Sequence, residues 1–403
     1  MDIFNLFYNT FMASVNNNSA KTYFWNDQKT RAILYQIVTA AVVAFLGYYL
    51  ISNVQNNMAK QSIASGFGFI EKEAAFEIGE SLIEYSAADS YGRALVVGVL
   101  NTLKISIVGM LLTTILGTIV GVATLSSNWL ISRLGNIYVE IFQNIPVLLQ
   151  LFFFYALFYE TFPSPRQALN PFTGVFITNR GLDFAVPAAH PAWGYMGVVF
   201  LAACVITFVV KRWSVKRQET TGQQFPMFWA GLGILVGLPL LTWFVNGAPT
   251  QMDIPELKGF NFTGGRNISP EFSALLIGLV LYTASFIAQI VRAGIQSISH
   301  GQTEAAMSIG LKPAHVLKLV IFPQALRVIV PPLTSQLLNL TKNSSLAVAI
   351  GYPDFVQVAG TTINQTGQAV EGVALMMMVY LTFSLLTSAY MNWYNKKIAI
   401  IER

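Results

Sequence analysis

Two lysines stand inside long apolar stretches, where a charge is costly and therefore points to function. Lys104 lies within one stretch, and Lys342 lies near the end of another and is followed by Asn343 and Ser344. An ammonium group beside an amide and a hydroxyl could receive the carboxylate of a small solute. The alternative is that each lysine extends its long side chain to the membrane surface. These four residues are candidates for a solute path.

Amide side chains in the same stretches offer acceptors for an ammonium group. Asn101, Gln150 and Gln289 are the amides in question. Hydrogen bonding between neighbouring helices is the competing interpretation, and we favour it for Gln150. Asn101 and Gln289 are therefore added to the candidate solute path.

The sequence carries no pattern for enzymatic chemistry. The phosphate-binding pattern G-x-x-x-x-G-K-[ST] is absent. No Ser-His-Asp set, cluster of metal ligands or pair of carboxylates converges in the apolar stretches, and Cys204 is the single cysteine. We therefore expect a protein that is not an enzyme and binds no cofactor itself. If ATP drives its activity, a separate chain must hydrolyse it.

The segment between Glu304 and Pro323, EAAMSIGLKPAHVLKLVIFP, joins two strongly apolar stretches. Small residues, which let a foreign backbone come close, occur at Ala305, Ala306 and Gly310. The apolar positions fit one face of a short helix that Pro313 must interrupt or restart. Such a helix could dock into a groove on a soluble partner. Alternatively, the segment is an ordinary solvated loop in which Gly310 only turns the chain.

Composition places the chain in a membrane. Of its 403 residues, 54% are hydrophobic and 11% are charged, and the mean hydropathy is +0.54. Soluble domains have nearer one quarter charged residues. The net charge of +5 does not indicate nucleic-acid binding, because the basic residues fall between apolar stretches instead of forming a patch.

Apolar stretches of spanning length predict about eight transmembrane helices. The first lies at 32–52, and the third, at about 137–160, is expected to be one helix. An acidic outer segment, expected to be partly helical, follows the first span. The predicted divisions are a cytoplasmic N-terminus at 1–31, the first helix at 32–52, the acidic periplasmic segment at 53–92, a first core part at 93–160, a two-helix insertion at 161–271, a second core part at 272–393 containing the loop 301–323, and a cytoplasmic tail at 394–403.

The distribution of basic residues predicts the orientation. With both termini in the cytoplasm, the inner segments hold roughly twice as many of the 24 Lys and Arg residues as the outer segments do. This orientation also places the loop 301–323 in the cytoplasm, where a soluble ATPase would be.

The motifs in and around this loop resemble the permeases of ABC importers of the polar and general L-amino-acid group. EAA followed by Gly310 and Pro323 is similar to the EAA loop of that family. The flanking segments GQTEAA and PQALRVIVPPL, and also GVLNTLKIS, FQNIPVLLQLFFFY and LTKNSSLAVAI, resemble its other motifs. The chain departs from the pattern at Gln143, where the family often has Arg, and at Gln289, where it often has Glu.

The resemblance implies an all-α polytopic membrane protein with the type I ABC importer permease fold. A five-helix core would carry an added N-terminal helix and the two-helix insertion. The implied partners are ABC ATPase subunits that use ATP, a second permease subunit that is a different chain, a periplasmic amino-acid-binding protein and membrane lipid. The implied location is the bacterial inner membrane. Contact with the ATPase would fall to Gly301, Glu304, Ala305, Ala306, Gly310 and Pro323.

Two other interpretations remain open. A secondary transporter working alone would carry inverted repeats and acidic residues within its spans. We find no clear repeat, and Glu140, Glu160 and Glu371 lie near span ends. A membrane scaffold or sensor would be expected to carry a soluble signalling domain, and none is visible.

Overall fold

The structure, a computed structural model, describes residues 28–60 and 65–398. The chain divides into two compact units, one of residues 1–69 with 363–371 and the other of residues 70–362 with 372–403. The first unit contains helix α2 (Gln28–Lys60), whose apolar side chains are exposed along its length. The predictions for 1–31 and for the end of the tail fall largely outside the described residues.

Long apolar helices dominate the described part of the chain. Seven of them could each cross a bilayer, and an eighth crossing is possible if a bent pair counts as one. The predicted polytopic helical fold is confirmed. The helices are α2, α3 (Tyr91–Thr124), α6 (Pro191–Thr221), α7 with α8 (Met227–Leu232 and Leu238–Val245), α9 (Pro270–Gln296), α11 with α12 (Pro313–Val316 and Phe322–Asn343) and α14 (Ala369–Ile398).

The third predicted span is not one helix. α4 (Trp129–Asn144) and α5 (Val147–Thr161) meet at an angle of 103°. Pro146 lies at the break, and a proline disfavours helical geometry in the residue before it. The Gln150 amide donates to the freed carbonyls of Phe142 and Ile145, at 2.9 Å each. Gln150 therefore stabilises the bend, and its bond from α5 to α4 confirms the prediction of hydrogen bonding between neighbouring helices.

Helix α9 lies at the centre of the second unit because small residues let its neighbours approach closely. Glycines of α3 face it: a Cβ added at Gly117 would lie 2.6 Å from the Ile287 Cβ, and one at Gly121 would lie 2.7 Å from the Val291 Cβ. Such close backbone packing is how helices associate inside a bilayer. Because Gly117 meets Ile287 and Gly121 meets Val291, α3 and α9 run in the same direction. Helices α5 and α12 also pack on α9.

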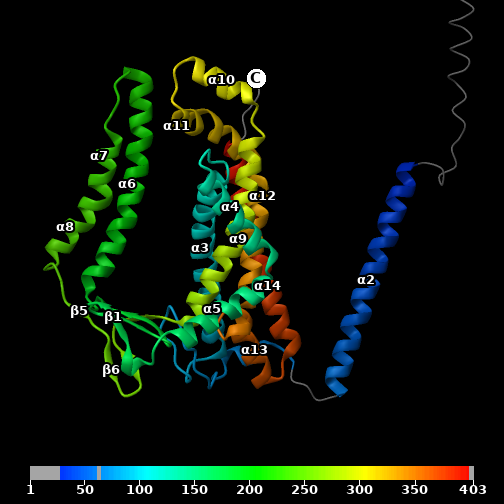
Figure 1. Ribbon diagram of the computed structural model, residues 1–403. Coiled ribbons are helices and arrows are strands. Elements are labelled where there is room, and N and C mark those ends of the chain that lie inside the picture. The colour runs from blue at the N-terminus through cyan, green and yellow to red at the C-terminus, as the bar shows by residue number, and fades with distance from the viewer. Residues whose placement is uncertain (1–27, 61–64, 399–403) are drawn as a thin grey trace, which may run out of the picture. The chain divides into compact units, whose positions relative to one another are not determined.

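The insertion forms a helical hairpin on a base of short strands. Strands β1 (Leu169–Phe172), β2 (Val175–Thr178) and β3 (Gly181–Phe184) form an antiparallel sheet that β8 (Arg266–Ile268) completes. Smaller ladders join β4 (Val186–Pro187) with β5 (Met252–Asp253) and β6 (Glu256–Lys258) with β7 (Asn261–Thr263). Pairing of β3 with β8 brings the two ends of the insertion together. The α6–α8 hairpin extends from this base (Figure 1).

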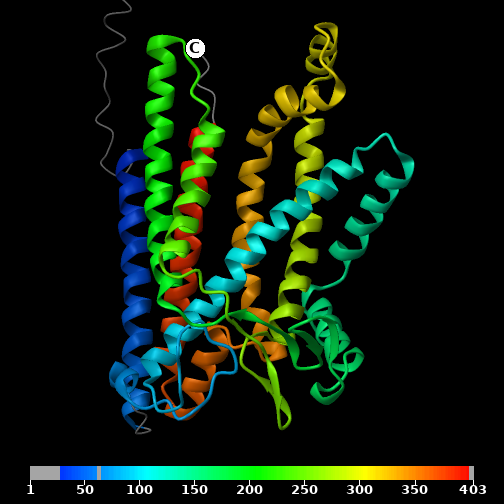
Figure 2. The same ribbon diagram turned by 90° about the vertical axis from the view of Figure 1, so that its left-hand side faces the viewer.

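Within the second unit, the strands lie at one end of the long helices (Figure 1). Helices α10 (His300–Ser308) and α11 lie at the other end (Figure 2). We call these the strand end and the α10 end. Where the structure describes the acidic segment, residues 53–60 belong to α2 and Phe67–Glu71 form a 3-10 turn, so the prediction of partly helical structure is confirmed. Residues 72–89, which lie at the strand end, form no helix.

Candidate functional site

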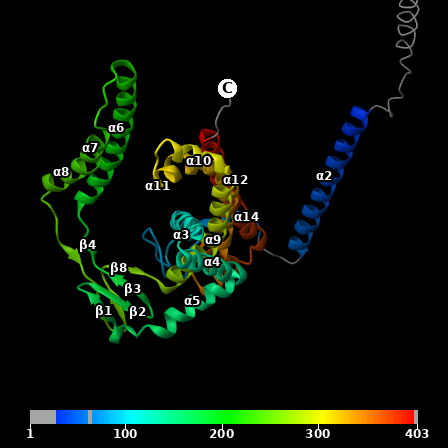
Figure 3. The same ribbon diagram turned by 45° about the horizontal axis from the view of Figure 1, so that its top comes forward.

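The loop at the α10 end consists of two short helices separated by a sharp turn (Figure 3). Helix α10 ends where Gly310 adopts a φ of +86°. The Gly310 amide donates to the Met307 carbonyl, and the Leu311 amide donates to the Ala306 carbonyl. This is the Schellman arrangement, which favours glycine at its left-handed position. Gly310 therefore turns the chain, as the alternative interpretation expected.

Helix α10 also exposes an apolar surface. Ile309 is 79% exposed and Met307 is 47% exposed, whereas Ala306 is buried. A Cβ added at Gly301 or Gly310 would meet no atom within 4 Å among the described residues beyond the adjacent backbone. Glu304 is exposed and pairs with His300 one turn earlier. Exposed apolar side chains at the end of a short helix, with open space beside its glycines, suit docking into another protein.

The chain beyond α10 is helical for longer than the sequence predicts. Pro313 occupies the first turn of α11, as a helix start allows. A π turn, Leu317–Ile321, then carries the helix into α12, where Pro323 lies in the first turn. The helical path into α12 therefore begins at Pro313, inside the predicted loop 301–323.

At the strand end, Glu80 joins three parts of the chain. Its carboxylate accepts from the Lys104 ammonium of α3 and, at 2.6 Å, from the Ser269 hydroxyl before α9. Its backbone carbonyl accepts from the Asn101 amide at 2.8 Å. Lys104 also lies over the Phe272 ring, 4.1 Å from its centroid. Glu80 thus fastens the acidic segment to both core helices, and we call this set the Glu80 junction.

The residues after α12 attach to the same place. Asn101 is fully buried and also donates to the Pro353 carbonyl at 2.9 Å. The Tyr352 hydroxyl donates to the Asn101 carbonyl at 3.3 Å, and the Phe355 amide donates to Thr102 at 2.9 Å. The loop before α13 (Phe355–Thr366) is therefore fixed to the beginning of α3.

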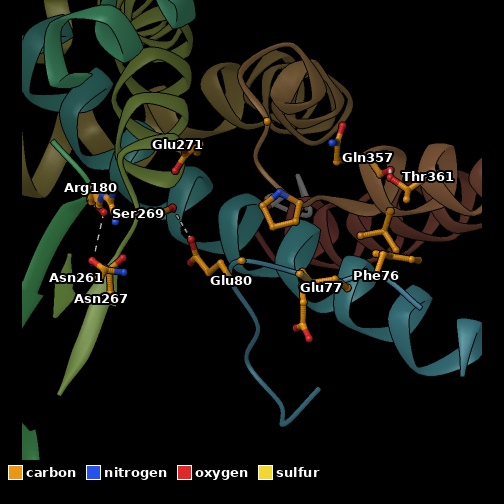
Figure 4. Close-up of a pocket in the computed structure, with 15 residues that line it drawn as sticks. Phe76, Glu77, Glu80, Arg180, Asn261, Asn267, Ser269, Glu271, Gln357 and Thr361 are labelled. Atoms are coloured by element: carbon orange, nitrogen blue, oxygen red, sulfur yellow. Dashed lines mark hydrogen bonds between the residues drawn. The ribbon is translucent and has the colours of Figure 1, made fainter. Parts of the chain in front are cut away.

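Beside the Glu80 junction lies a cavity of about 520 Å³ (Figure 4). Four segments line it: the acidic segment, the turn at Arg180, residues 261–271 at the end of the strand base and the start of α9, and the loop before α13 together with the first turns of α13. Its charged lining residues are Glu77, Glu80, Arg180 and Glu271. Both signs of charge therefore border this space.

Comparison with known proteins shows what kind of chain this is. The family described as "Binding-protein-dependent transport system inner membrane component" matches residues 212–400. The general L-amino acid transport system permease protein AapQ of Rhizobium johnstonii is 47% identical over 94% of each chain. The putative amino-acid ABC transporter permease protein YhdX of Escherichia coli is 46% identical, covering 93% of this chain and 95% of its own.

This chain belongs to the amino-acid ABC transporter permease family. A third relative, the glutamate/glutamine/aspartate/asparagine transport system permease protein BztB of Rhodobacter capsulatus, is 42% identical over 94% of this chain and 96% of its own. Among solved structures, one described as "Crystal structure of an amino acid ABC transporter with histidines" aligns with a TM-score of 0.45 and 18% identity, covering 76% of this chain and 95% of that one.

The permease does not bring the predicted solute-path residues into one cluster. Asn101 and Lys104 take part in the Glu80 junction, and the Ser344 hydroxyl is buried and donates to the Thr341 carbonyl. Gln289 is exposed and lies level with Gly121, which is 20 residues from Asn101 along α3 and so roughly 30 Å away. Lys342 is exposed, and Asn343 beside it is half-buried.

Sequence reasoning missed Glu80, Ser269 and Arg180 as site residues. The acidic segment was noted only for its composition, and no local spacing connects Glu80 with a lysine 24 positions later. Lys104 was the one signal in the sequence for a charged partner, since a lysine inside an apolar stretch needs a counter-charge.

The buried carboxyl of Asp354, in the loop fixed to α3, should make the stability of the permease depend on pH. The carboxyl is fully buried and accepts from the Gln357 amide and the Tyr380 hydroxyl, at 2.9 Å each. Burial raises its pKa from 3.8 to about 6. Between these values the folded state binds more protons than the unfolded state. The free energy of unfolding therefore falls as pH rises through this window, by about 2–3 kcal/mol in total.

Asp354→Asn is expected to remove this pH dependence while it keeps both hydrogen-bonded contacts. The measurement is the thermal unfolding of the detergent-solubilised permease at pH 5 and pH 7. Wild type should unfold at a lower temperature at pH 7, and the variant should show little difference. Asp253→Asn, at an exposed aspartate, is the control and should behave as wild type. An equal pH response in wild type and Asp354→Asn would contradict the assignment.

Proposed function

We propose that the permease is the membrane subunit of an ATP-driven importer of L-amino acids. It receives substrate from a periplasmic binding protein at the strand end, and separate ATPase subunits drive it at the α10 end. Support comes from the names of its relatives and from the exposed α10 surface, which is the observation that carries the proposal. The permease itself binds no ATP, because its sequence lacks the phosphate-binding pattern.

The proposed assembly has further parts. The α10 end faces the cytoplasm, and both termini lie on that side. α14 runs toward the α10 end, in agreement with a cytoplasmic C-terminus (Figure 2). A second, different permease chain completes the pore, and α10 of each permease seats on one ATPase subunit.

Reconstitution tests this function. The permease, its partner permease, the ATPase and the binding protein are placed in liposomes, and uptake of radiolabelled L-amino acids is measured with and without ATP. Uptake that requires ATP, the ATPase and the binding protein is expected. Uptake by this chain alone, driven by an ion gradient, would overturn the proposal in favour of a secondary transporter.

Lys342 is proposed to lie on the substrate path near the strand end of α12. Its ammonium group makes no hydrogen bond or ion pair with any residue that the structure describes, so it is available to a carboxylate. Lys342→Met is expected to lower the uptake rate several-fold, and Lys342→Arg should retain most of it. Lys104→Met should lower uptake less at equal membrane abundance, because Lys104 is already paired with Glu80. Wild-type uptake in both Met variants would refute this role.

A further inference from the structure

The cavity beside the Glu80 junction has features that suit a ligand. Its volume of about 520 Å³ lies within the range of small-molecule sites, roughly 300–1,000 Å³. Arg180, Ser269 and Glu271 lie on one side of it, and Gln357 and Thr361 lie on the other (Figure 4). Helix ends and strand ends supply these groups, so rigid elements position much of the lining.

The carboxylates bordering the cavity differ in how many of their oxygens already accept a hydrogen bond or form an ion pair. Glu80 is engaged by Lys104 and Ser269. Glu271 accepts a single hydrogen bond through Oε1, from the Tyr155 hydroxyl at 3.3 Å, and its Oε2 has no partner within the described residues. Glu77 is exposed and makes no ion pair with any described residue. Free carboxylate oxygens therefore remain at the cavity.

The positive charge at the cavity is also available. The Arg180 guanidinium donates to the Phe260 carbonyl at 3.1 Å through one Nη1–H. Its other N–H groups make no ion pair with a carboxylate in the part of the chain that the structure describes. A guanidinium of this kind matches a carboxylate with two parallel hydrogen bonds.

A ligand that satisfies both groups needs an ammonium and a carboxylate close together. A simple cation would leave Arg180 unused, and a simple anion would meet the free carboxylates. Phe76, Pro353 and Val358 form an apolar part of the lining. This part can contact ligand substituents of different kinds, because it does not require a polar group on the ligand. The chemistry of the lining is therefore that of a zwitterion with a variable substituent.

We propose that this cavity binds free L-α-amino acids, with Glu271 receiving the ammonium group and Arg180 the carboxylate. The choice of ligand rests on the proposed function. The site receives the amino acid at the strand end before it enters the path between the core helices. The insertion and the acidic segment thus supply a binding site in addition to covering the helix ends.

The test uses the assembled transporter in lipid nanodiscs without the binding protein. Binding of radiolabelled L-glutamine is measured in competition with glutaramic acid, which lacks the ammonium group, and with 4-aminobutanamide, which lacks the carboxylate. Wild type should bind L-glutamine at least tenfold more tightly than either analogue. Glu271→Gln and Arg180→Gln should each weaken L-glutamine binding at least tenfold and each abolish the preference over the matching analogue.

Two matched variants serve as controls. Glu256→Gln and Arg266→Gln change exposed residues of the same strand base that do not line the cavity. Both should bind L-glutamine within twofold of wild type. Unchanged L-glutamine binding in Glu271→Gln and Arg180→Gln, or no binding by wild type, would overturn the site.

Uptake by the complete system separates the two proposals. If wild type shows ATP-dependent uptake and the cavity variants bind L-glutamine as wild type does, the proposed function stands and this site is refuted. Absence of ATP-dependent uptake by wild type refutes the function itself.

Discussion

Gly310→Asp is expected to lower amino-acid uptake at least tenfold while the assembled transporter still hydrolyses ATP. The added carboxylate would stand on the exposed turn after α10, where no described residue other than the two chain neighbours lies within 4 Å of a Cβ. It would therefore obstruct and repel a partner surface without disturbing the protein's own packing. Uptake and ATP hydrolysis are measured on the same proteoliposomes, at equal abundance of the variant and wild type.

Controls separate docking from backbone strain. A residue other than glycine at a φ of +86° costs about 1–2 kcal/mol, although Asn and Asp tolerate this conformation better than most. Gly310→Asn keeps the shape of the new side chain without its charge and should have a smaller effect. Gly222→Asp places the same residue at another exposed glycine with positive φ, +71°, after α6. Coupled transport should persist there. Equal loss in Gly222→Asp, or normal uptake in Gly310→Asp, would contradict a coupling role for this turn.

Glu80→Gln is expected to produce the largest loss of stability among single changes at the strand end. Glutamine keeps the size of the side chain and one of its two acceptor oxygens but leaves the Lys104 ammonium without its counter-charge. The two side chains are only 12% and 24% exposed, so solvent compensates poorly. Breaking a fully buried pair costs about 3–5 kcal/mol. For this partly exposed pair we expect about 1–3 kcal/mol after allowance for screening.

A double-mutant cycle measures the interaction between the two residues. Glu80→Gln, Lys104→Met and the double variant are unfolded thermally in the same detergent, and the double variant should be less destabilised than the sum of the two single changes. Asp89→Asn, which breaks the more exposed pair with Arg93, should cost less than about 1 kcal/mol. Additive effects at Glu80 and Lys104 would show that the junction does not depend on their charges.

The positions of the long helices could be predicted from the sequence because bilayer thickness sets the length of an apolar run. The exposed turn at Gly310 could also be anticipated from small residues between two such runs. The bend between α4 and α5 was missed, although Pro146 was a visible signal. The strand base was missed too, although Gly174 after Phe172 and the pair Gly264–Gly265 mark turns between β-prone residues.

The Glu80 junction and the neighbouring cavity were beyond sequence reasoning for a different reason. Glu80 meets Ser269 across 189 positions of the chain, and the cavity is assembled from four separate segments. Contacts of this range depend on how the helices pack, which no local pattern specifies. The intramembrane lysine therefore indicated a charged partner but not its identity.

Pairing of Leu182 in β3 with Ile268 in β8 has a consequence for how this permease could have acquired its length. Opposite residues of an antiparallel pair lie about 5 Å apart. A tight turn could therefore replace everything between them and leave the flanking chain where it is. The hairpin could therefore have been gained or exchanged at this one pair of strands, without a change in the packing of the core helices.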